Sequence, residues 1–188
     1  MKLNSVIIDA DFCIKIGASD RYHYLERVLM ELADRVYIHE VVYREILSPV
    51  CAKKQLDCLK DQGIVVLLHE KELSPTELLV YQNTYQLLKG AMINPRNPRK
   101  NNGEVSSLAM AKTKSIPYFA TDEKDLQPII NKHINNGIDD VTCIRIKDII
   151  LKIKAGEISG FTRKEAKVLW RLSGKSTEIF DRDIWPAV

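Results

Sequence analysis

Short runs of β-branched residues alternate along this chain with longer segments of helical periodicity, and this alternation constrains the fold most strongly. The runs predict buried strands at Ser5–Asp9, Val36–His39, Ile64–Leu68, Pro117–Thr121 and Val141–Ile146. The intervening segments predict helices at Arg21–Ala33, Val41–Leu47, Ala52–Lys60, Glu104–Thr113, Lys124–His133 and Lys147–Lys154. The pattern predicts an α/β fold with a central, mostly parallel sheet of about five strands flanked by helices.

Helix caps locate two further helices and a change of character near the C-terminus. Ser74 and Glu77 form a capping box, so we expect a helix that stops at Gly90. A second capping box at Thr162 and Glu165 opens a helix that ends near Gly174, and Asp20 is the expected cap of Arg21–Ala33. Strands are not expected beyond about Gly156. We therefore divide the chain into a domain of residues 1–155 and a helical extension of residues 156–188, which packs on the core or on a partner.

Composition excludes several classes of protein. A chain of 188 residues with 45% hydrophobic and 28% charged residues can bury a sizeable core and is not a disordered chain. The net charge of +3 argues against binding nucleic acid by bulk charge, although it leaves room for local basic patches. The 4 cysteines have no zinc-type or disulfide-scaffold spacing. Without a signal peptide or a long apolar run, a cytoplasmic protein with no membrane partner is expected.

Acidic residues stand where predicted strands end. Asp9 ends the first strand, Asp122 ends the fourth, and Asp125 follows one helical turn later. Open parallel sheets bind ligands at the carboxyl ends of their strands, so these side chains are candidates for a site. Each of them taken alone is equally explained as a helix cap or as an acid favoured by the helix dipole.

Two further acids strengthen the hypothesis of a site. Glu45 follows Val41 and Val42 at helical spacing, which places it on an apolar face, where it needs an ion pair, a metal or a cleft edge. Glu104 stands at the start of a predicted helix. Carboxylates gathered on one face repel one another unless a cation is present, and Mg²⁺ or Mn²⁺ prefers such oxygen ligands. Phosphodiester hydrolysis commonly uses sites of this kind.

These residues stand in segments that resemble the PIN-domain nuclease family, which includes VapC-type toxins. The segments are Val6–Asp11, Val41–Ile46, Gly103–Ala109 and Phe119–Leu126. The resemblance covers roughly residues 3 to 150 and implies a PIN-like three-layer fold. It also implies an Mg²⁺- or Mn²⁺-dependent endoribonuclease with Asp9, Glu45, Glu104, Asp122 and Asp125 as catalytic acids. All of these except Glu45 are expected as metal ligands, with Glu45 completing the shell directly or through water.

The same resemblance implies partners: an RNA substrate, an antitoxin protein and a second copy of the chain in a homodimer.

The chain departs from the family in three places. Asp11 stands where the family often has an uncharged polar residue, and it either reaches the metal through water or caps the next helix. The connection from Glu45 to Glu104 is long, and the region after Gly156 has no counterpart in a minimal toxin.

A loop before Glu104 is the candidate contact with substrate. Within Asn94–Gly103, the side chains suited to phosphate oxygens and base edges are those of Arg96, Arg99, Lys100 and Asn102. A solvated loop explains the same composition. Tyr81 and Tyr85 lie one turn apart, which is the spacing of base-stacking residues but is more typical of core packing.

Two other functions fit parts of the pattern. Asp9 and Asp11 after an apolar strand also resemble the nucleophile and general acid of haloacid-dehalogenase-type phosphatases, although Glu45 and Glu104 are then unexplained. The alternative outside enzymology is a PIN-like binding module without catalysis. If the five proposed acids surround a metal ion, the 28 Lys and Arg residues stand against the 20 other acidic residues. A net charge of +8 then surrounds an acidic pocket.

Overall fold

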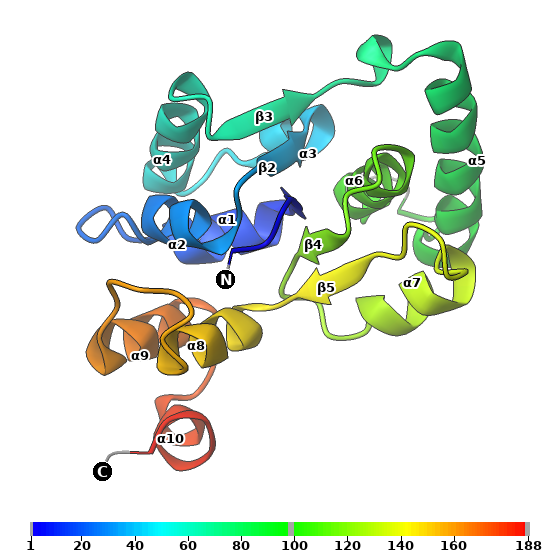
Figure 1. The fold of residues 1–188 in the computed structure, drawn as a ribbon. Helices are drawn as coiled ribbons and strands as arrows, with labels where there is room; N and C mark the ends of the chain where they lie inside the picture. Colours follow the sequence, from blue (N-terminus) through cyan, green and yellow to red (C-terminus); the bar gives the residue numbers. More distant parts are fainter. Residues whose placement is uncertain (1, 98–99, 187–188) are drawn as a thin grey trace.

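Five short strands form one parallel sheet in the order β3-β2-β1-β4-β5, which confirms the predicted α/β fold (Figure 1). The computed structural model describes residues 2–97 and 100–186. The strands are β1 (Val6–Ile8), β2 (Val36–His39), β3 (Val65–Leu68), β4 (Tyr118–Ala120) and β5 (Thr142–Ile144). Each observed strand lies within a run that the sequence predicts, because buried parallel strands are nearly continuous in β-branched and other apolar residues.

The helices are α1 (Ala10–Gly17), α2 (Tyr24–Leu32), α3 (Glu40–Glu45), α4 (Val50–Asp61), α5 (Pro75–Met92), α6 (Asn102–Thr113), α7 (Leu126–His133), α8 (Ile146–Lys154), α9 (Arg163–Leu172) and α10 (Thr177–Ile179). A 3₁₀ turn at Glu70–Glu72 and a π-type turn at Phe180–Ile184 complete the described elements. No helix of the described residues has both the length and the apolar character needed to cross a membrane.

The central strand divides the core into two clusters, one on each face of the sheet. Val6 and Ile8 of β1 belong to the cluster under α1, α2, α4, α8 and α9, whereas Ile7 belongs to the cluster under α5, α6 and α7. This separation follows from the period of two along a strand, which sends successive side chains to opposite faces. The result is three layers, with helices on both sides of the sheet (Figure 1).

The C-terminal extension shares the first of these clusters. Its buried side chains at Leu169, Trp170, Phe180 and Ile184 pack in the cluster that contains Val6 and Ile8. The capping boxes at Ser74 and Thr162 both form as predicted. The extension therefore packs on α8 and α1 within the apolar core of this side of the sheet.

Two local predictions are wrong, and one helix was not predicted. The helix expected to stop at Gly90 continues to Met92; a glycine inside a helix costs only about 1 kcal/mol, and burial of Leu88 against the second core cluster offsets this. The residue that precedes α2 is His23, in a left-handed conformation, and not Asp20. Helix α1 was not predicted as an element, because it begins directly after β1 without the turn residues that mark a boundary.

The order of the strands locates the crevice of the sheet. The chain passes from β1 outward to β2 and β3, then returns through α5 and α6 to β4 on the other side of β1. Neighbouring connections diverge where β1 and β4 lie side by side, and ligands of open α/β sheets bind outside the carboxyl ends of the strands at such a point. Asp9 and Thr121 directly follow these two strands.

Candidate active site

Asp9 is the most deeply buried of the predicted acids. Its backbone N–H donates to the carbonyl of Ala120 at 3.0 Å, which joins the ends of β1 and β4. It occupies the N-cap position of α1, but its carboxylate makes no capping hydrogen bond. Its residue exposure is 2%, and Oδ2 has no hydrogen-bond partner within the described residues. The interpretation of Asp9 as a helix cap therefore fails.

The surroundings of Asp9 disfavour its ionised form. Burial raises the pKa of Asp9 to about 8, and repulsion by Glu104 adds to this, as does repulsion by Asp11 and Glu45. The backbone N–H of Ala10 acts in the opposite direction and lowers the pKa of Asp9. A carboxylate in this position is neutral near pH 7 unless a positive charge comes close to it.

Glu104 and Glu45 approach Asp9 from α6 and α3. Burial raises the pKa of Glu104, with repulsion from Glu123 and Asp11 in the same direction and attraction by Lys100 against it. Glu45 is an exposed residue and not one on a buried apolar face, but partial desolvation of its carboxylate still raises its pKa, and repulsion by Glu104 is the second cause. The structure therefore brings three predicted acids from three elements into one electrostatically coupled group.

Gly103 makes this approach possible. A Cβ atom placed on Gly103 would lie 2.6 Å from Oε2 of Glu45 and 3.1 Å from Cγ2 of Val42. A larger residue would push the carboxylate away, because real Cβ atoms do not approach that closely. The glycine before Glu104 thus leaves room for the Glu45 carboxylate, which alanine at position 103 would displace.

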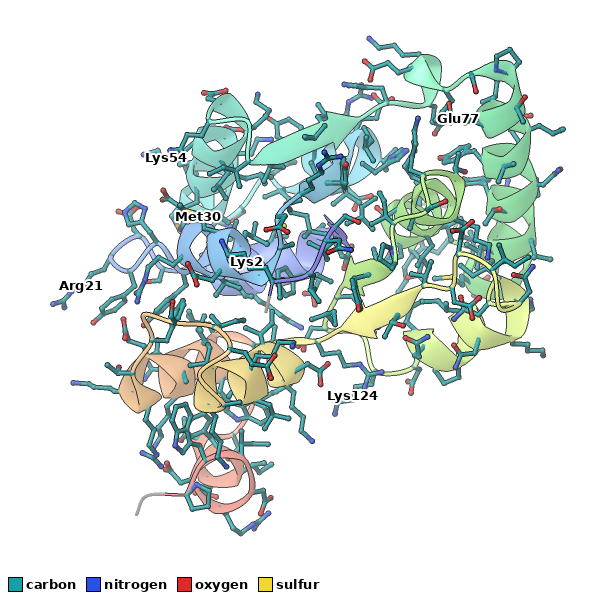
Figure 2. The ribbon with its side chains drawn as sticks, in the orientation of Figure 1. Lys2, Arg21, Met30, Lys54, Glu77 and Lys124 are labelled. Atoms are coloured by element: carbon teal, nitrogen blue, oxygen red, sulfur yellow. The ribbon has the colours of Figure 1, made fainter. Side chains whose placement is uncertain are left out.

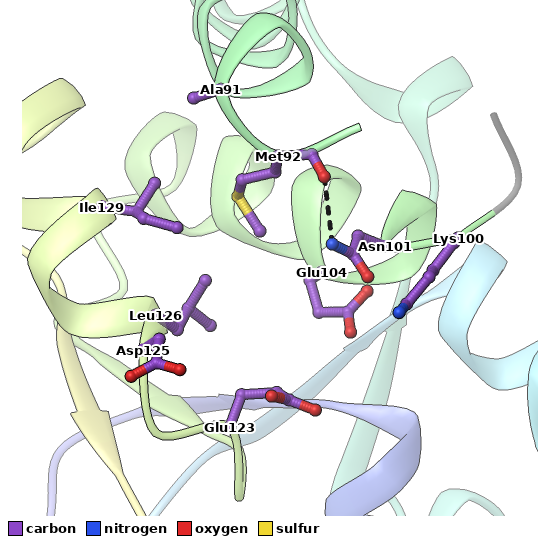
Figure 3. A pocket seen from close by; sticks show the side chains of 9 residues that line it. All are labelled: Ala91, Met92, Lys100, Asn101, Glu104, Glu123, Asp125, Leu126 and Ile129. Carbon is purple, nitrogen blue, oxygen red and sulfur yellow. Dashed lines mark hydrogen bonds between the residues drawn. The ribbon is translucent and has the colours of Figure 1, made fainter. Parts of the chain in front are cut away.

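A cavity of about 260 Å³ opens beside Glu104 (Figure 3). Glu123 and Asp125 from the loop after β4 line it, together with Lys100 and Asn101 before α6. Asp125 precedes α7 without making a capping bond, so it too is not explained as a helix cap. The structure thus brings Asp125 beside Glu104, and it adds Glu123, which the sequence analysis did not select.

Asp122 has different neighbours. Lys175 Nζ contacts its two oxygens at 2.6 and 2.8 Å, and Lys15 Nζ lies 3.0 Å from Oδ2. The side chain of Asp122 is 4% exposed. Lys15 also contacts Asp11 at 2.6 Å. Burial lowers the pKa of Lys15, but hydrogen bonds to Asp11 and Asp122 outweigh it and raise the value above its usual range.

The loop after β4 separates these two environments. Asp122 and Lys124 line a groove beside the C-terminal helices, whereas Glu123 and Asp125 line the cavity beside Glu104. The buried hydroxyl of Thr121 accepts from the backbone N–H of Glu123 at 3.2 Å, which holds the start of the loop. Successive residues of this loop therefore line the lysine-rich groove and the acid-rich cavity in turn.

The acids fit a hard divalent cation by their chemistry. Asp9 provides a buried oxygen without a partner, and Glu104 and Glu45 provide further carboxylates that destabilise one another when ionised. Oxygen donors of this type suit Mg²⁺ or Mn²⁺. Within residues 2–97 and 100–186, no three or more His, Cys, Asp or Glu side chains already converge in the arrangement of a metal site.

The predicted substrate loop is only partly available to a ligand. Arg96 is exposed, and Lys100 lines the cavity beside Glu104. Arg99 lies outside the described residues. Asn102 accepts a hydrogen bond from the Tyr85 hydroxyl at 2.7 Å, so it joins α6 to α5. Tyr81 is buried in the second core cluster, in agreement with core packing.

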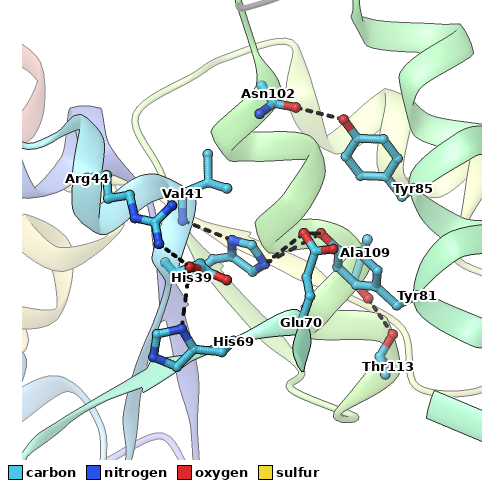
Figure 4. Close-up of polar contacts among 11 residues, drawn as sticks. His39, Val41, Arg44, His69, Glu70, Tyr81, Tyr85, Asn102, Ala109 and Thr113 are labelled. Carbon is cyan, nitrogen blue, oxygen red and sulfur yellow. Dashed lines mark hydrogen bonds and ion pairs between the residues drawn. The ribbon is translucent and has the colours of Figure 1, made fainter. Parts of the chain in front are cut away.

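A second polar network lies at the ends of β2 and β3 (Figure 4). His39 is fully buried, its Nδ1 accepts from the backbone N–H of Val41 at 3.2 Å, and burial lowers its pKa to about 4. Tyr81 stacks on the imidazole and donates to Glu70 at 2.7 Å. His69 lies 3.5 Å from Glu40. These contacts fasten α3 and α5 to the sheet beside the candidate site.

Comparison with protein-family models, with curated proteins and with solved structures finds no match to this chain. The interpretation of function therefore depends on the chemistry of the site.

Three charged residues of the site were not selected from the sequence. Lys15 follows Asp11 by four positions, and this spacing on a helix is a recognisable signal for an ion pair. Glu123 adjoins Asp122, but it lies one position beyond the strand end that made Asp122 a candidate. Lys175 follows Asp122 by 53 positions, and no local pattern connects the two.

Proposed function

We propose that this protein is an Mg²⁺- or Mn²⁺-dependent endoribonuclease of the PIN-domain type. The observation that carries the proposal is the Asp9 carboxylate, buried at the end of the central strand with one unpartnered oxygen and with Glu104 and Glu45 close enough to raise its pKa. A buried carboxylate without a hydrogen-bond partner is unfavourable in its ionised form unless a cation compensates it, and neighbouring carboxylates increase this cost. The resemblance in the four sequence segments supports the same activity.

In this mechanism the acids hold and orient the reacting groups. Asp9, Glu104 and Glu45 would hold the cation, with Glu123 and Asp125 lining its approach. A bound divalent cation supplies the charge that activates water and stabilises the leaving oxygen in phosphodiester hydrolysis. Lys100 lies at the same cavity and is placed to attract a phosphate oxygen. Asp122 joins the acid set only if Lys15 and Lys175 release it.

The test is a cleavage assay on single-stranded RNA, structured RNA and single-stranded DNA with Mg²⁺ or Mn²⁺. Asp9→Asn is expected to reduce cleavage at least about 100-fold, because loss of a direct ligand exceeds the usual cost of losing a supporting residue. Asp61→Asn is the matched control, since Asp61 is 78% exposed at the end of α4. Cleavage by the wild type in EDTA would refute the metal-dependent mechanism.

Other outcomes select the other functions. Hydrolysis of p-nitrophenyl phosphate with RNA untouched would favour a phosphatase that uses Asp9 and Asp11. RNA binding without cleavage under any metal condition would favour the PIN-like binding module. Gel filtration with light scattering tests the homodimer.

We further propose that this nuclease is the toxin of a toxin–antitoxin pair. Expression of the wild type is then expected to arrest growth, whereas Asp9→Asn is not. Co-expression of a small neighbouring gene product should relieve the arrest. Harmless expression of an enzyme that is active in vitro would contradict the toxin role and leave the nuclease intact.

A further inference from the structure

The C-terminal extension and the ends of β4 and β5 enclose a groove of about 590 Å³. Four cationic side chains line it: Lys124 after β4, Arg145 and Lys147 after β5, and Lys175 after α9. The groove also contains two acids, Asp122 and Asp183. Figure 2 shows Lys124 in the β4–α7 loop, and the groove is lined by this residue together with Trp170 and Lys175 of the extension.

Both acids of the groove already have cationic partners. Asp122 is held by Lys15 and Lys175 as described above. Arg182 contacts the two oxygens of Asp183 through Nε at 2.7 Å and Nη2 at 2.9 Å. The negative charge in the groove is therefore compensated from within the protein.

The remaining three cations are less fully compensated, although Lys147 helps to lower the pKa of Asp183. Lys124, Arg145 and Lys147 form no ion pair with any acidic side chain of the described residues. The guanidinium of Arg145 donates to the carbonyl of Lys124, which fixes it against the β4–α7 loop. Lys124 and Lys147 are exposed. Cations in excess of the acids that line the same groove raise the local potential and favour an anion.

Two of these cations also face a second hollow, where acids accompany them. Arg145 and Lys147 line an adjoining hollow of about 630 Å³ over β5 and α8, together with the amides of Gln127 and Asn131 and the carboxylates of Asp140 and Asp148. The four cations of the first groove can contact several phosphates of one strand, whereas a single phosphate ion occupies only part of that groove. At its other end, the groove is separated from the acid cavity by one loop, Asp122–Asp125.

We propose that this groove binds the phosphate backbone of single-stranded RNA and leads the strand toward the acids around Asp9. This role rests on the proposed nuclease function, and it assigns a purpose to residues 156–188. Lys124, Arg145 and Lys147 contact the phosphates. Lys175 lines the same groove, and its ammonium bonds the carboxylate of Asp122 at the end of β4.

The experiment measures binding of a fluorescein-labelled single-stranded RNA by fluorescence anisotropy in EDTA, where a metal-dependent enzyme cannot cleave it. The double variant Lys124→Glu/Lys147→Glu is expected to bind roughly tenfold more weakly, with a salt dependence shallower by about 1.4, since each phosphate contact on a single strand contributes about 0.7 to the slope. The single variants should show intermediate losses. Thermal unfolding checks that the substituted proteins are folded.

Lys54→Glu is the matched control, because Lys54 is an exposed lysine of α4, on another part of the molecule (Figure 2). It should change affinity less than about twofold. Equal losses in Lys54→Glu and in Lys124→Glu would overturn the groove, as would unchanged binding in the double variant. Binding of inorganic phosphate or a mononucleotide at constant ionic strength, with no binding of the RNA, would also overturn it.

Cleavage with Mn²⁺, measured on the same variants, separates the two proposals. RNA binding that requires Lys124 and Lys147, without cleavage, supports the groove while contradicting the nuclease. Cleavage that requires Asp9 but is unaffected in rate and affinity by Lys124→Glu/Lys147→Glu supports the nuclease and overturns the groove.

Discussion

Replacing Asp9 by asparagine is expected to flatten the pH dependence of the free energy of unfolding between pH 6.5 and 8. Burial, followed by repulsion from Glu104, raises the pKa of Asp9 from 3.8 to about 8. A group whose pKa is higher in the folded state stabilises that state fully below its unfolded pKa, and this contribution is lost as the pH rises to the folded value. The loss amounts to about 1.4 kcal/mol for each pH unit.

The useful pH window is set by His39. Burial lowers the pKa of His39 from 6.5 to about 4, so its contribution has the opposite sign: stability is complete above pH 6.5 and is lost as the pH falls toward 4. The effects of Asp9 and His39 therefore oppose each other below pH 6.5. Between pH 6.5 and 8 the Asp9 contribution is no longer masked, and it amounts to roughly 2 kcal/mol.

The assay is urea unfolding at 25 °C in EDTA at half-unit steps from pH 6.5 to 8. The wild type should lose roughly 2 kcal/mol over this interval, and Glu45 and Glu104, whose pKa values are also raised by burial, act in the same direction. Asp9→Asn removes the Asp9 contribution. The slope is the readout, because the offset between the two curves depends on how the amide packs.

Asp61→Asn serves as the control, since its exposed side chain should leave the slope of the wild type unchanged. An equal slope in the wild type and in Asp9→Asn would refute the reasoning, because it would mean that Asp9 binds the same number of protons in the folded and unfolded states over this interval.

Three further predictions concern the same protein. In Asp9→Asn, the free energy of unfolding should fall by roughly 2 kcal/mol from pH 6.5 to 5, and His39→Gln should remove this fall if burial of the imidazole causes it. Gly103→Ala should cost about 1–3 kcal/mol in urea unfolding and reduce cleavage by displacing Glu45, whereas Gly90→Ala, whose Cβ would meet no heavy atom within 4 Å, should stabilise α5 by about 0.5–1 kcal/mol; equal effects would contradict the packing. Mg²⁺ at 100 times its dissociation constant should stabilise the wild type by about 2.7 kcal/mol and Asp9→Asn not at all, and equal stabilisation of both would exclude Asp9 as a ligand.

Local sequence determined the elements of the fold. Runs such as Val36–His39 are strands because β-branched side chains suit a sheet that is covered on both faces. The capping boxes at Ser74 and Thr162 start helices because each satisfies backbone donors within three residues. Strand-end position selected Asp9, and helix position selected Glu45 and Glu104. These signals depend on neighbours in the chain, so the sequence alone was sufficient to locate the strands and most helices and to select these acids as candidates.

Tertiary structure decided how the acids are partnered. Nothing near Asp122 in the sequence predicts the ammonium of Lys175, which reaches it only because α9 and the residues after it pack on the main core. Likewise, Gly103 is needed because α3 and α6, far apart in the chain, bring Glu45 against it. The charge state of a carboxylate depends on burial and on charges within a few ångströms. The positions of those charges are set by long-range packing, which local sequence patterns do not encode.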